Sequence, residues 1–217
     1  MVNLDDISNN LQSGKARETS ALITKAIAEN YTIDTIVKHG LIAGIQAAEA
    51  RYGRNEVLVP EIRMARRAME WGIRQIKQAI AAAGRTALGT VVIGTVEGDI
   101  EDQNKNIIAV MMESRGLRVI DLGTSVSPAR FVETAEKEQA RIIVCSASLV
   151  STMAQMKVVV QETLSAGIRN RVKIILTGGP VTERYCRLIG ADMYAHDAVI
   201  AADLAEACCG SINALRG

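Results

Sequence analysis

Aromatic side chains are scarce in this sequence, which has one Phe, one Trp and four Tyr among its 217 residues. Proteins that bind single-stranded nucleic acid stack successive bases on aromatic rings, so the composition argues against that mode of binding. Backbone, aliphatic and hydroxyl groups would have to hold any flat ligand instead.

An excess of charge of either sign is also missing, because 25 Lys and Arg face 24 Asp and Glu. No global field would therefore draw the protein to nucleic acid or to an anionic membrane. The first twelve residues contain no apolar run of signal length, and no window reaches the roughly 18 unbroken apolar residues of a membrane span. We expect a soluble, cytoplasmic protein that contacts neither nucleic acid nor membrane and binds a small ligand or a protein partner.

Cysteine and histidine are few and lack the spacing of a metal site. The four cysteines, at 145, 186, 208 and 209, form no Cys-x-x-Cys pair, and the adjacent Cys208 and Cys209 are poorly placed to join each other. We interpret all four as reduced core or helix residues. The two histidines, His39 and His196, are not near the cysteines in sequence.

The first 83 residues have helical periodicity throughout. Apolar residues recur at three-and-four spacing, for instance from Ile36 to Ala48, and no strand pattern interrupts them. Breaks are expected at residues 30–34 and 53–60, and Pro60 suits the first turn of a last long helix. This half predicts a bundle of four antiparallel helices.

From Thr86 the pattern changes to short apolar runs that alternate with segments of helix length. We expect strands at 88–93, 118–122, 141–145, 172–176 and 192–194, and helices near 103–115, 128–138, 152–166, 182–189 and 198–208. This order predicts a doubly wound, parallel, five-stranded sheet of the Rossmann-like (flavodoxin-like) type, with ligands at the carboxyl ends of its strands. The expected domains are residues 1–85 and 86–217.

The loop after the first strand, residues 94–102, combines glycine with acidic side chains. Gly94 and Gly98 let the backbone turn sharply and approach a ligand, and Asp99 and Asp102 are good candidates to cap the following helix. Taken alone, this is an ordinary capped turn of a parallel α/β protein.

The loops after the third and fourth strands carry hydroxyls and paired glycines. Ser146 and Ser148 are candidates to bind polar ligand edges, whereas Ser151 or Thr152 is expected to cap the next helix. Gly178 and Gly179 remove two side chains where a bulky ligand would need room, although a tight turn explains them equally well.

Together these loops resemble a known family. Residues 98–107 are similar to the Asp-x-His-x-x-Gly segment of cobalamin-binding domains, found in methionine synthase and in the corrinoid proteins of methylamine and methanol methyltransferase systems. Further similarities follow in the same order along the chain: the Ser-x-Leu loop at Ser146, Thr152 and Met153; the Gly-Gly loop at residues 178–182; the closing segment 190–198; and, upstream, residues 40–44 and 59–62 of the helical cap.

The resemblance implies a set of cofactor contacts and no catalytic residue. They are Gly98, Asp99, Ile100, Glu101, Asp102 and Asn104 in the first loop, Ser146, Ser148, Leu149, Val150 and Thr152 after the third strand, Gly178 and Gly179 after the fourth, and Tyr194 and Ala198 near the end. Leu58, Val59, Met64 and Met69 of the cap are candidates to cover the upper corrin face, or are simply bundle core.

The chain departs from the family pattern at the centre of this motif. Glu101 stands where the family has the histidine that ligates cobalt, Asn104 replaces its glycine, and Ser148 replaces the Leu of Ser-x-Leu. The resemblance implies that Asp99 and Ser146 would support that histidine. A carboxylate is a harder donor than imidazole, so Glu101 is a doubtful substitute and no metal ligand is assigned.

Three outcomes remain open for the lower side of cobalt: weak coordination by Glu101 or water, no lower ligand, or loss of the corrinoid. We favour retained binding, with the cofactor base-off, because most of the binding area comes from its tail and corrin faces. His196 is a further candidate for a polar contact with the cofactor, whereas His39 fits a surface or packing role better.

The leading hypothesis is a cobalamin-binding carrier that presents a methyl group to separate methyltransferase subunits. One alternative is a cobalamin sensor or storage protein, and another is an interaction protein that keeps the fold without cobalamin. A homodimer is left open.

Overall fold

The computed structural model describes residues 1–84 and 87–213, with the side chains of 211–213 left out of the description. The chain divides into two compact units, Met1–Gly84 and Arg85–Gly217. The predicted domain boundary, between residues 85 and 86, lies outside the described residues.

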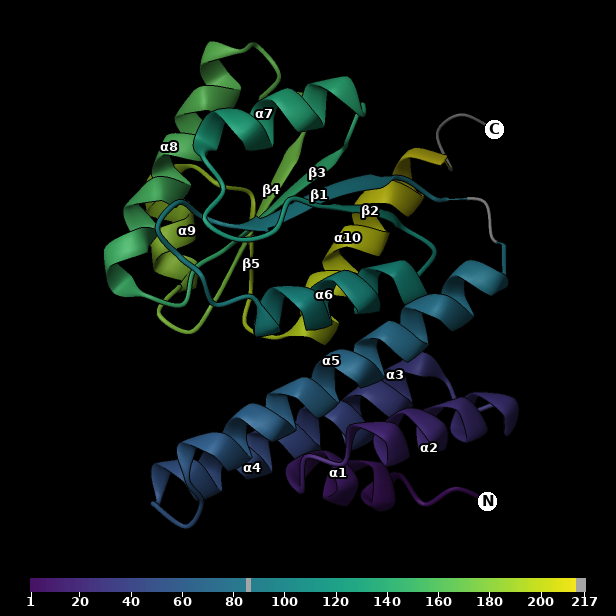
Figure 1. The fold of residues 1–217 in the computed structure, drawn as a ribbon. Coiled ribbons are helices and arrows are strands. Elements are labelled where there is room, and N and C mark those ends of the chain that lie inside the picture. Colours follow the sequence, from purple (N-terminus) through teal and green to yellow (C-terminus); the bar gives the residue numbers. More distant parts are fainter. Residues whose placement is uncertain (85–86, 214–217) are drawn as a thin grey trace. The chain divides into compact units, whose positions relative to one another are not determined.

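The first unit is entirely helical in its described part (Figure 1). Its elements are α1 (Leu4–Gln12), α2 (Ala16–Ala28), α3 (Ile33–Thr35), the π-helical turn η1 (Ile36–Ile42), α4 (Ala43–Gly53) and α5 (Val59–Ala82). Because α3, η1 and α4 follow one another without a break, the unit has four helical segments, as expected. Its core is aliphatic and includes Ile7, Leu11, Ile23, Leu41 and Ile76.

The long helix α5 begins as its sequence predicts. Pro60 lies in the first turn, and the backbone N–H of Leu58 donates to the Glu61 carboxylate at 2.7 Å. Further along, Met69 is only 1% exposed and belongs to the bundle core, whereas Met64 is 52% exposed. Of the two methionines considered for the cap surface, only Met64 is therefore available to it.

The second unit contains one parallel sheet in the order β2-β1-β3-β4-β5. The strands are β1 (Thr90–Thr95), β2 (Arg118–Asp121), β3 (Ile142–Ser146), β4 (Lys173–Thr177) and β5 (Met193–Ala195). This is the flavodoxin-like order, in which the direction of winding reverses between β1 and β3. The predicted fold class is confirmed, and each strand lies within two residues of its expected position.

Helices cover both faces of the sheet (Figure 1). They are α6 (Gln103–Ser114), α7 (Pro128–Lys137), the short 3-10 turn η2 (Val150–Thr152), α8 (Met153–Ser165), α9 (Glu183–Ile189) and α10 (Ala198–Asn213). Helices α6 and α10 pack together on one face, and α7, α8 and α9 lie on the other. The three central strands β1, β3 and β4 are mostly apolar and buried, as expected of strands covered on both faces, whereas the edge strand β2 carries Arg118 and Asp121.

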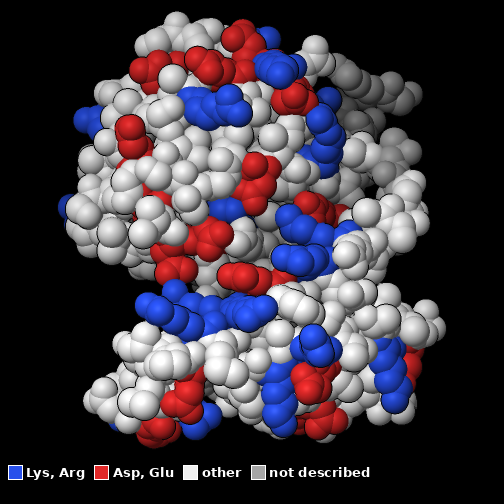
Figure 2. All heavy atoms as spheres, viewed as in Figure 1, with Lys and Arg blue, Asp and Glu red and all other residues white. Residues whose placement is uncertain are grey.

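Three bulk properties of the described residues bear on the sequence predictions. Acidic and basic side chains are interspersed over the α/β unit on the face seen in Figure 2, in keeping with the formal net charge of +1. Within residues 1–84 and 87–213, none of the helices is long and apolar enough to cross a bilayer. The four cysteines are free thiols, and three of them are buried.

Candidate cofactor-binding site

Three loops meet at the carboxyl edge of the sheet, where the winding reverses. Thr95 and Ser146 are register partners at the ends of β1 and β3. Just beyond them, the N–H of Val96 donates to Ser146 O at 3.0 Å, and the N–H of Ala147 donates to Thr177 O at 3.1 Å. The β1–α6, β3–α8 and β4–α9 loops are thus held side by side. Ligands of open α/β sheets bind at this position.

Asp99 lies at the centre of these loops and is fully buried. Its carboxylate accepts hydrogen bonds from the Ser148 hydroxyl at 2.7 and 2.9 Å, from the Ser148 N–H, from the Thr152 hydroxyl at 3.2 Å and from the Glu101 N–H at 3.1 Å. The serine bonded to Asp99 is therefore Ser148, and not Ser146 as the resemblance implied. These bonds join the β1–α6 loop to the β3–α8 loop.

The environment of Asp99 favours its ionised form. Burial alone would raise the pKa of Asp99, but hydrogen bonds from Ser148, Glu101 and Thr152 outweigh burial and lower the pKa from its ordinary value. A buried carboxylate that accepts several hydrogen bonds can keep its charge, because the donors replace the water that it has lost. Asp99 therefore acts as an anionic link between two loops.

Glu101 is turned toward the start of α6. Its side chain is partly buried, and one carboxylate oxygen accepts a long hydrogen bond, 3.4 Å, from the N–H of Gln103. The expectation that Asp102 caps this helix is wrong, since its carboxylate accepts from the Asn106 side chain at 2.9 Å and makes no capping bond.

The hydroxyl expected to cap α8 also acts elsewhere. Thr152 precedes α8 but makes no capping bond through its side chain, because its hydroxyl bonds with Asp99 and with the carbonyl of Leu149. Ser151 is exposed and likewise makes no such bond. The capping prediction failed because a buried carboxylate binds this hydroxyl more strongly than an exposed helix end does.

The paired glycines of the β4–α9 loop have different environments. Gly178 has φ +127°, and a Cβ at this position would lie 1.8 Å from the carbonyl oxygen of Ala147. Gly178 is thus required by close backbone contact within the protein. A Cβ on Gly179 would have no atom within 4 Å. The space beside Gly179 is open, as a site for a bulky ligand requires.

Apolar side chains surround this polar centre and point to solvent. Ile100, Leu149 and Val150 are 81%, 53% and 75% exposed. Nearby, at the end of β4, the hydroxyl of Thr177 is buried without a hydrogen-bond partner among the described residues. Exposed aliphatic groups beside an open glycine and an unpaired hydroxyl fit a large ligand that has both apolar faces and polar edges.

The remaining predicted contacts are on the β1–α6 loop, on α6, on β5 and at the start of α10. Gly98 and Asn104 are exposed in the β1–α6 loop and the first turn of α6. Tyr194 pairs with Leu176 on the edge strand β5 and packs against the core, and Ala198 is buried at the start of α10. Neither Tyr194 nor Ala198 is among the hydrogen-bond donors to the Asp99 carboxylate in the described part of the chain.

Both histidines are exposed. His39 is exposed on η1 in the helical unit. His196 is exposed just after β5, where its ring lies 3.2 Å from the Asp197 carboxylate.

Two residues that sequence analysis did not single out brace the β1–α6 loop. The buried Thr95 hydroxyl donates to the Asp99 carbonyl at 2.6 Å, and the N–H of Ser125 donates to the same carbonyl at 2.8 Å. The Ser125 hydroxyl in turn accepts from the N–H of Gly98 at 3.0 Å. Their only sequence signal was their place at strand ends, which many residues share.

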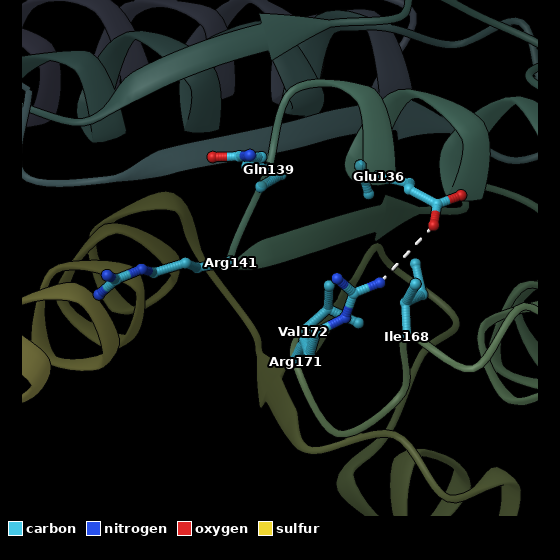
Figure 3. A pocket seen from close by; sticks show the side chains of 8 residues that line it. Glu136, Gln139, Arg141, Ile168, Arg171 and Val172 are labelled. Carbon is cyan, nitrogen blue, oxygen red and sulfur yellow. Dashed lines mark ion pairs between the residues drawn. The ribbon is translucent and has the colours of Figure 1, made fainter.

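A separate cavity opens at the opposite, amino edge of the sheet (Figure 3). Its volume is about 190 Å³, and it is lined by the end of α7, the start of β3 and the α8–β4 loop. The Arg171 guanidinium lies 3.6 Å from Glu136 across it, while the Arg141 side chain extends away from this pair. The cavity contains none of the predicted cofactor contacts.

This fold is that of a cobalamin-binding α/β protein, and comparison with known families agrees. One B12 binding domain model matches residues 89–208, and a second B12 binding domain model matches residues 4–77. The chain therefore belongs to the family of B12-binding corrinoid proteins.

Similar proteins cover nearly the whole chain. A corrinoid protein of Desulfitobacterium hafniense is 33% identical over 206 residues, which are 94% of this chain and 95% of that protein. Dimethylamine corrinoid protein 3 of Methanosarcina acetivorans is 32% identical over 90% of this chain and 91% of its own. Among solved structures, the monomethylamine corrinoid protein of Methanosarcina barkeri has a TM-score of 0.79 at 25% identity and covers 93% of this chain and 95% of its own.

Proposed function

We propose that this protein binds cobalamin at the carboxyl edge of its sheet, base-off and without a histidine below cobalt, and carries methyl groups between separate methyltransferase subunits. The observation that carries the proposal is the meeting of the β1–α6, β3–α8 and β4–α9 loops at the reversal of winding, inside the stretch matched by a B12 binding domain model. When bound, the cofactor supplies a cobalt centre that accepts and releases the methyl group.

The residues of the chain would hold the cofactor rather than react with it. The open space beside Gly179 would admit part of the ligand, and Ile100, Leu149 and Val150 would offer apolar surface. The other proposed contacts are Gly98, Asp99, Glu101, Asp102, Asn104, Ser146, Ser148, Thr152, Gly178, Tyr194 and Ala198. Glu101 is the poorest fit as a metal ligand, because a carboxylate is a harder donor and this one faces the start of α6.

The partners are proposed as a class. Relatives of this chain are named as dimethylamine and trimethylamine corrinoid proteins, and one similar fold comes from a methanol:cobalamin methyltransferase complex. We therefore expect a methyl-donating and a methyl-accepting methyltransferase subunit in the cytoplasm. A homodimer would appear as a doubled molar mass in light scattering of the loaded protein.

Reconstitution tests the proposal directly. The purified protein is mixed with hydroxocobalamin, passed through a desalting column, and its visible spectrum is recorded. We expect about one cobalamin retained per chain, with the spectrum of the base-off form. A colourless protein after desalting would overturn the proposal. Gly179→Leu, which fills the open space, serves as the matched variant and should retain less cofactor with an unchanged fold by circular dichroism.

A further inference from the structure

The hydrogen bonds of Asp99 fill one of its two carboxylate oxygens. An ionised carboxylate offers about four lone-pair sites, two on each oxygen. Oδ1 accepts from the Glu101 N–H and the Ser148 hydroxyl, whereas Oδ2 accepts from the Ser148 N–H and shares the single Thr152 hydroxyl proton with the Leu149 carbonyl. A further donor to Oδ1, such as an imidazole N–H, would have to displace one of its two groups.

The side chain at position 148 decides whether the Asp99 carboxylate keeps a free acceptor position for another donor. The resemblance gives Leu at this position. Because the side chain of Leu has no donor, an aspartate in the place of Asp99 would then keep one acceptor site for the N–H of a cobalt-ligating histidine. Here Ser148 fills that site at 2.7 Å, and position 101 carries Glu. Two of the three departures from the pattern, at 101 and 148, therefore fall on positions whose side chains would compete as donors for the same carboxylate, that of Asp99.

We propose that Ser148 is a positioning residue that takes the place of the histidine as the partner of Asp99, so that the changes at 101 and 148 form one coupled replacement. The loops that a metal-bound histidine would orient are instead joined by the hydroxyl of Ser148. The part of this inference that concerns cobalt rests on the proposed function, whereas the joining of the loops is a property of the protein itself. One consequence follows: restoring histidine at position 101 alone does not restore the lower ligand.

The first test uses the protein without cofactor. Ser148→Ala removes the hydroxyl, and Ser151→Ala removes an exposed hydroxyl from the same loop. Amide hydrogen exchange around residues 99–101, followed by NMR, should accelerate roughly tenfold or more in Ser148→Ala, as expected for loss of one hydrogen bond to a charged group, and should stay unchanged in Ser151→Ala. Equal exchange in the two variants would overturn the joining role.

The second test uses protein loaded with cobalamin and labelled with ¹⁵N-histidine. In the reduced, Co(II) state, electron paramagnetic resonance reports nitrogen bound below cobalt, and the label separates protein histidine from the cofactor's own base. We expect no protein nitrogen splitting in Glu101→His, and clear splitting in Glu101→His combined with Ser148→Leu. Full splitting in the single variant, or none in the loaded double variant, would overturn the coupling.

The design separates the two failures. If neither the unmodified protein nor any variant retains cobalamin, the proposed function fails while the exchange test still decides the role of Ser148. If Ser148→Leu prevents folding, Glu101→His combined with Ser148→Ala asks the same question with a smaller side chain and counts in the same way.

Discussion

The Lys105 ammonium of α6 holds both carboxylate oxygens of Asp121, at the end of β2, at 2.7 and 2.6 Å. The lysine side chain is 2% exposed and the aspartate side chain 29%. The same ammonium donates to the Asn106 side chain at 2.6 Å, and Asp121 also accepts from the N–H of Gly123 at 2.9 Å. This ion pair fastens the first turn of α6 to the sheet beside the candidate site.

Removing the two partners of this pair should have unequal costs. Asp121→Ala leaves a buried ammonium without its counter-charge, and we expect a loss of about 3–5 kcal/mol in the free energy of unfolding. Lys105→Met keeps an apolar chain of similar length and leaves a carboxylate that water can reach, so its cost should be clearly smaller. Urea denaturation measures both variants.

An exposed ion pair provides the control for that comparison. Arg187 and Glu183 on α9 are 74% and 66% exposed, and Glu183→Ala should cost below about 1 kcal/mol. A larger loss for Lys105→Met than for Asp121→Ala would contradict the view that the lysine is the buried member of the pair.

The paired glycines predict a contrast between adjacent substitutions. Gly178→Ala forces a Cβ into the Ala147 carbonyl at a positive φ, so the β4–α9 and β3–α8 loops must separate, and we expect a drop in melting temperature of several degrees. Gly179→Ala meets no atom and should leave the melting temperature of the cofactor-free protein almost unchanged. Differential scanning calorimetry decides between them. Equal melting temperatures would show that the loops can part at no cost.

The lowered pKa of Asp99 predicts how stability depends on pH. Because the folded-state pKa lies below the ordinary value of about 3.9, the ionised form contributes stability that is fully present above that value and is lost as pH falls through the lower, folded-state pKa. Asp99→Asn should be less stable at neutral pH and should lose this component of the acid dependence.

Urea midpoints measured from about pH 7 to pH 2 test this expectation. The difference between the unmodified protein and Asp99→Asn should be largest at neutral pH and should shrink below about pH 4. A difference that stays constant over the whole range would assign the effect of the substitution to packing alone.

The cysteines should differ in reactivity. Cys145 is fully buried in β3, and burial strongly raises the pKa of its thiol. Cys208 is only partly buried on α10, although burial raises its pKa as well. We expect iodoacetamide to modify Cys208 first in the native protein and Cys145 only after unfolding, as followed by mass spectrometry of peptides. Early modification of Cys145 would mean that the sheet opens locally.

The fold was largely predictable because the two halves of the chain have different hydrophobic periods. Strands appeared as runs such as Ile142–Ser146, which are buried on both faces, and Pro60 indicated the start of α5. The break between α1 and α2 had a weaker signal, since it depends on Gly14 at φ +69° and not on proline. Sequence patterns register apolar surface well and backbone dihedral angles poorly.

The place where the loops of the candidate site meet was predictable, but the hydrogen bonds between them were not. Topology alone predicts that the strand-end loops meet at the carboxyl edge of the sheet, and the structure brings them together there. Which hydroxyl reaches Asp99 depends on the path of the β3–α8 loop, and Ser146 and Ser148 are indistinguishable in composition. The capping prediction for Thr152 failed for the same reason. Its hydroxyl bonds with the buried carboxylate of Asp99, which lies 53 residues away in the sequence, and local sequence patterns do not show such a contact.

The internal link at Asp99 has a consequence for the buried charge. All the donors that replace water around this carboxylate are hydroxyl and amide groups of the chain itself, drawn from two loops about fifty residues apart. Parting the two loops would therefore strip the charge of its solvation, which ties the conformation of each loop to that of the other.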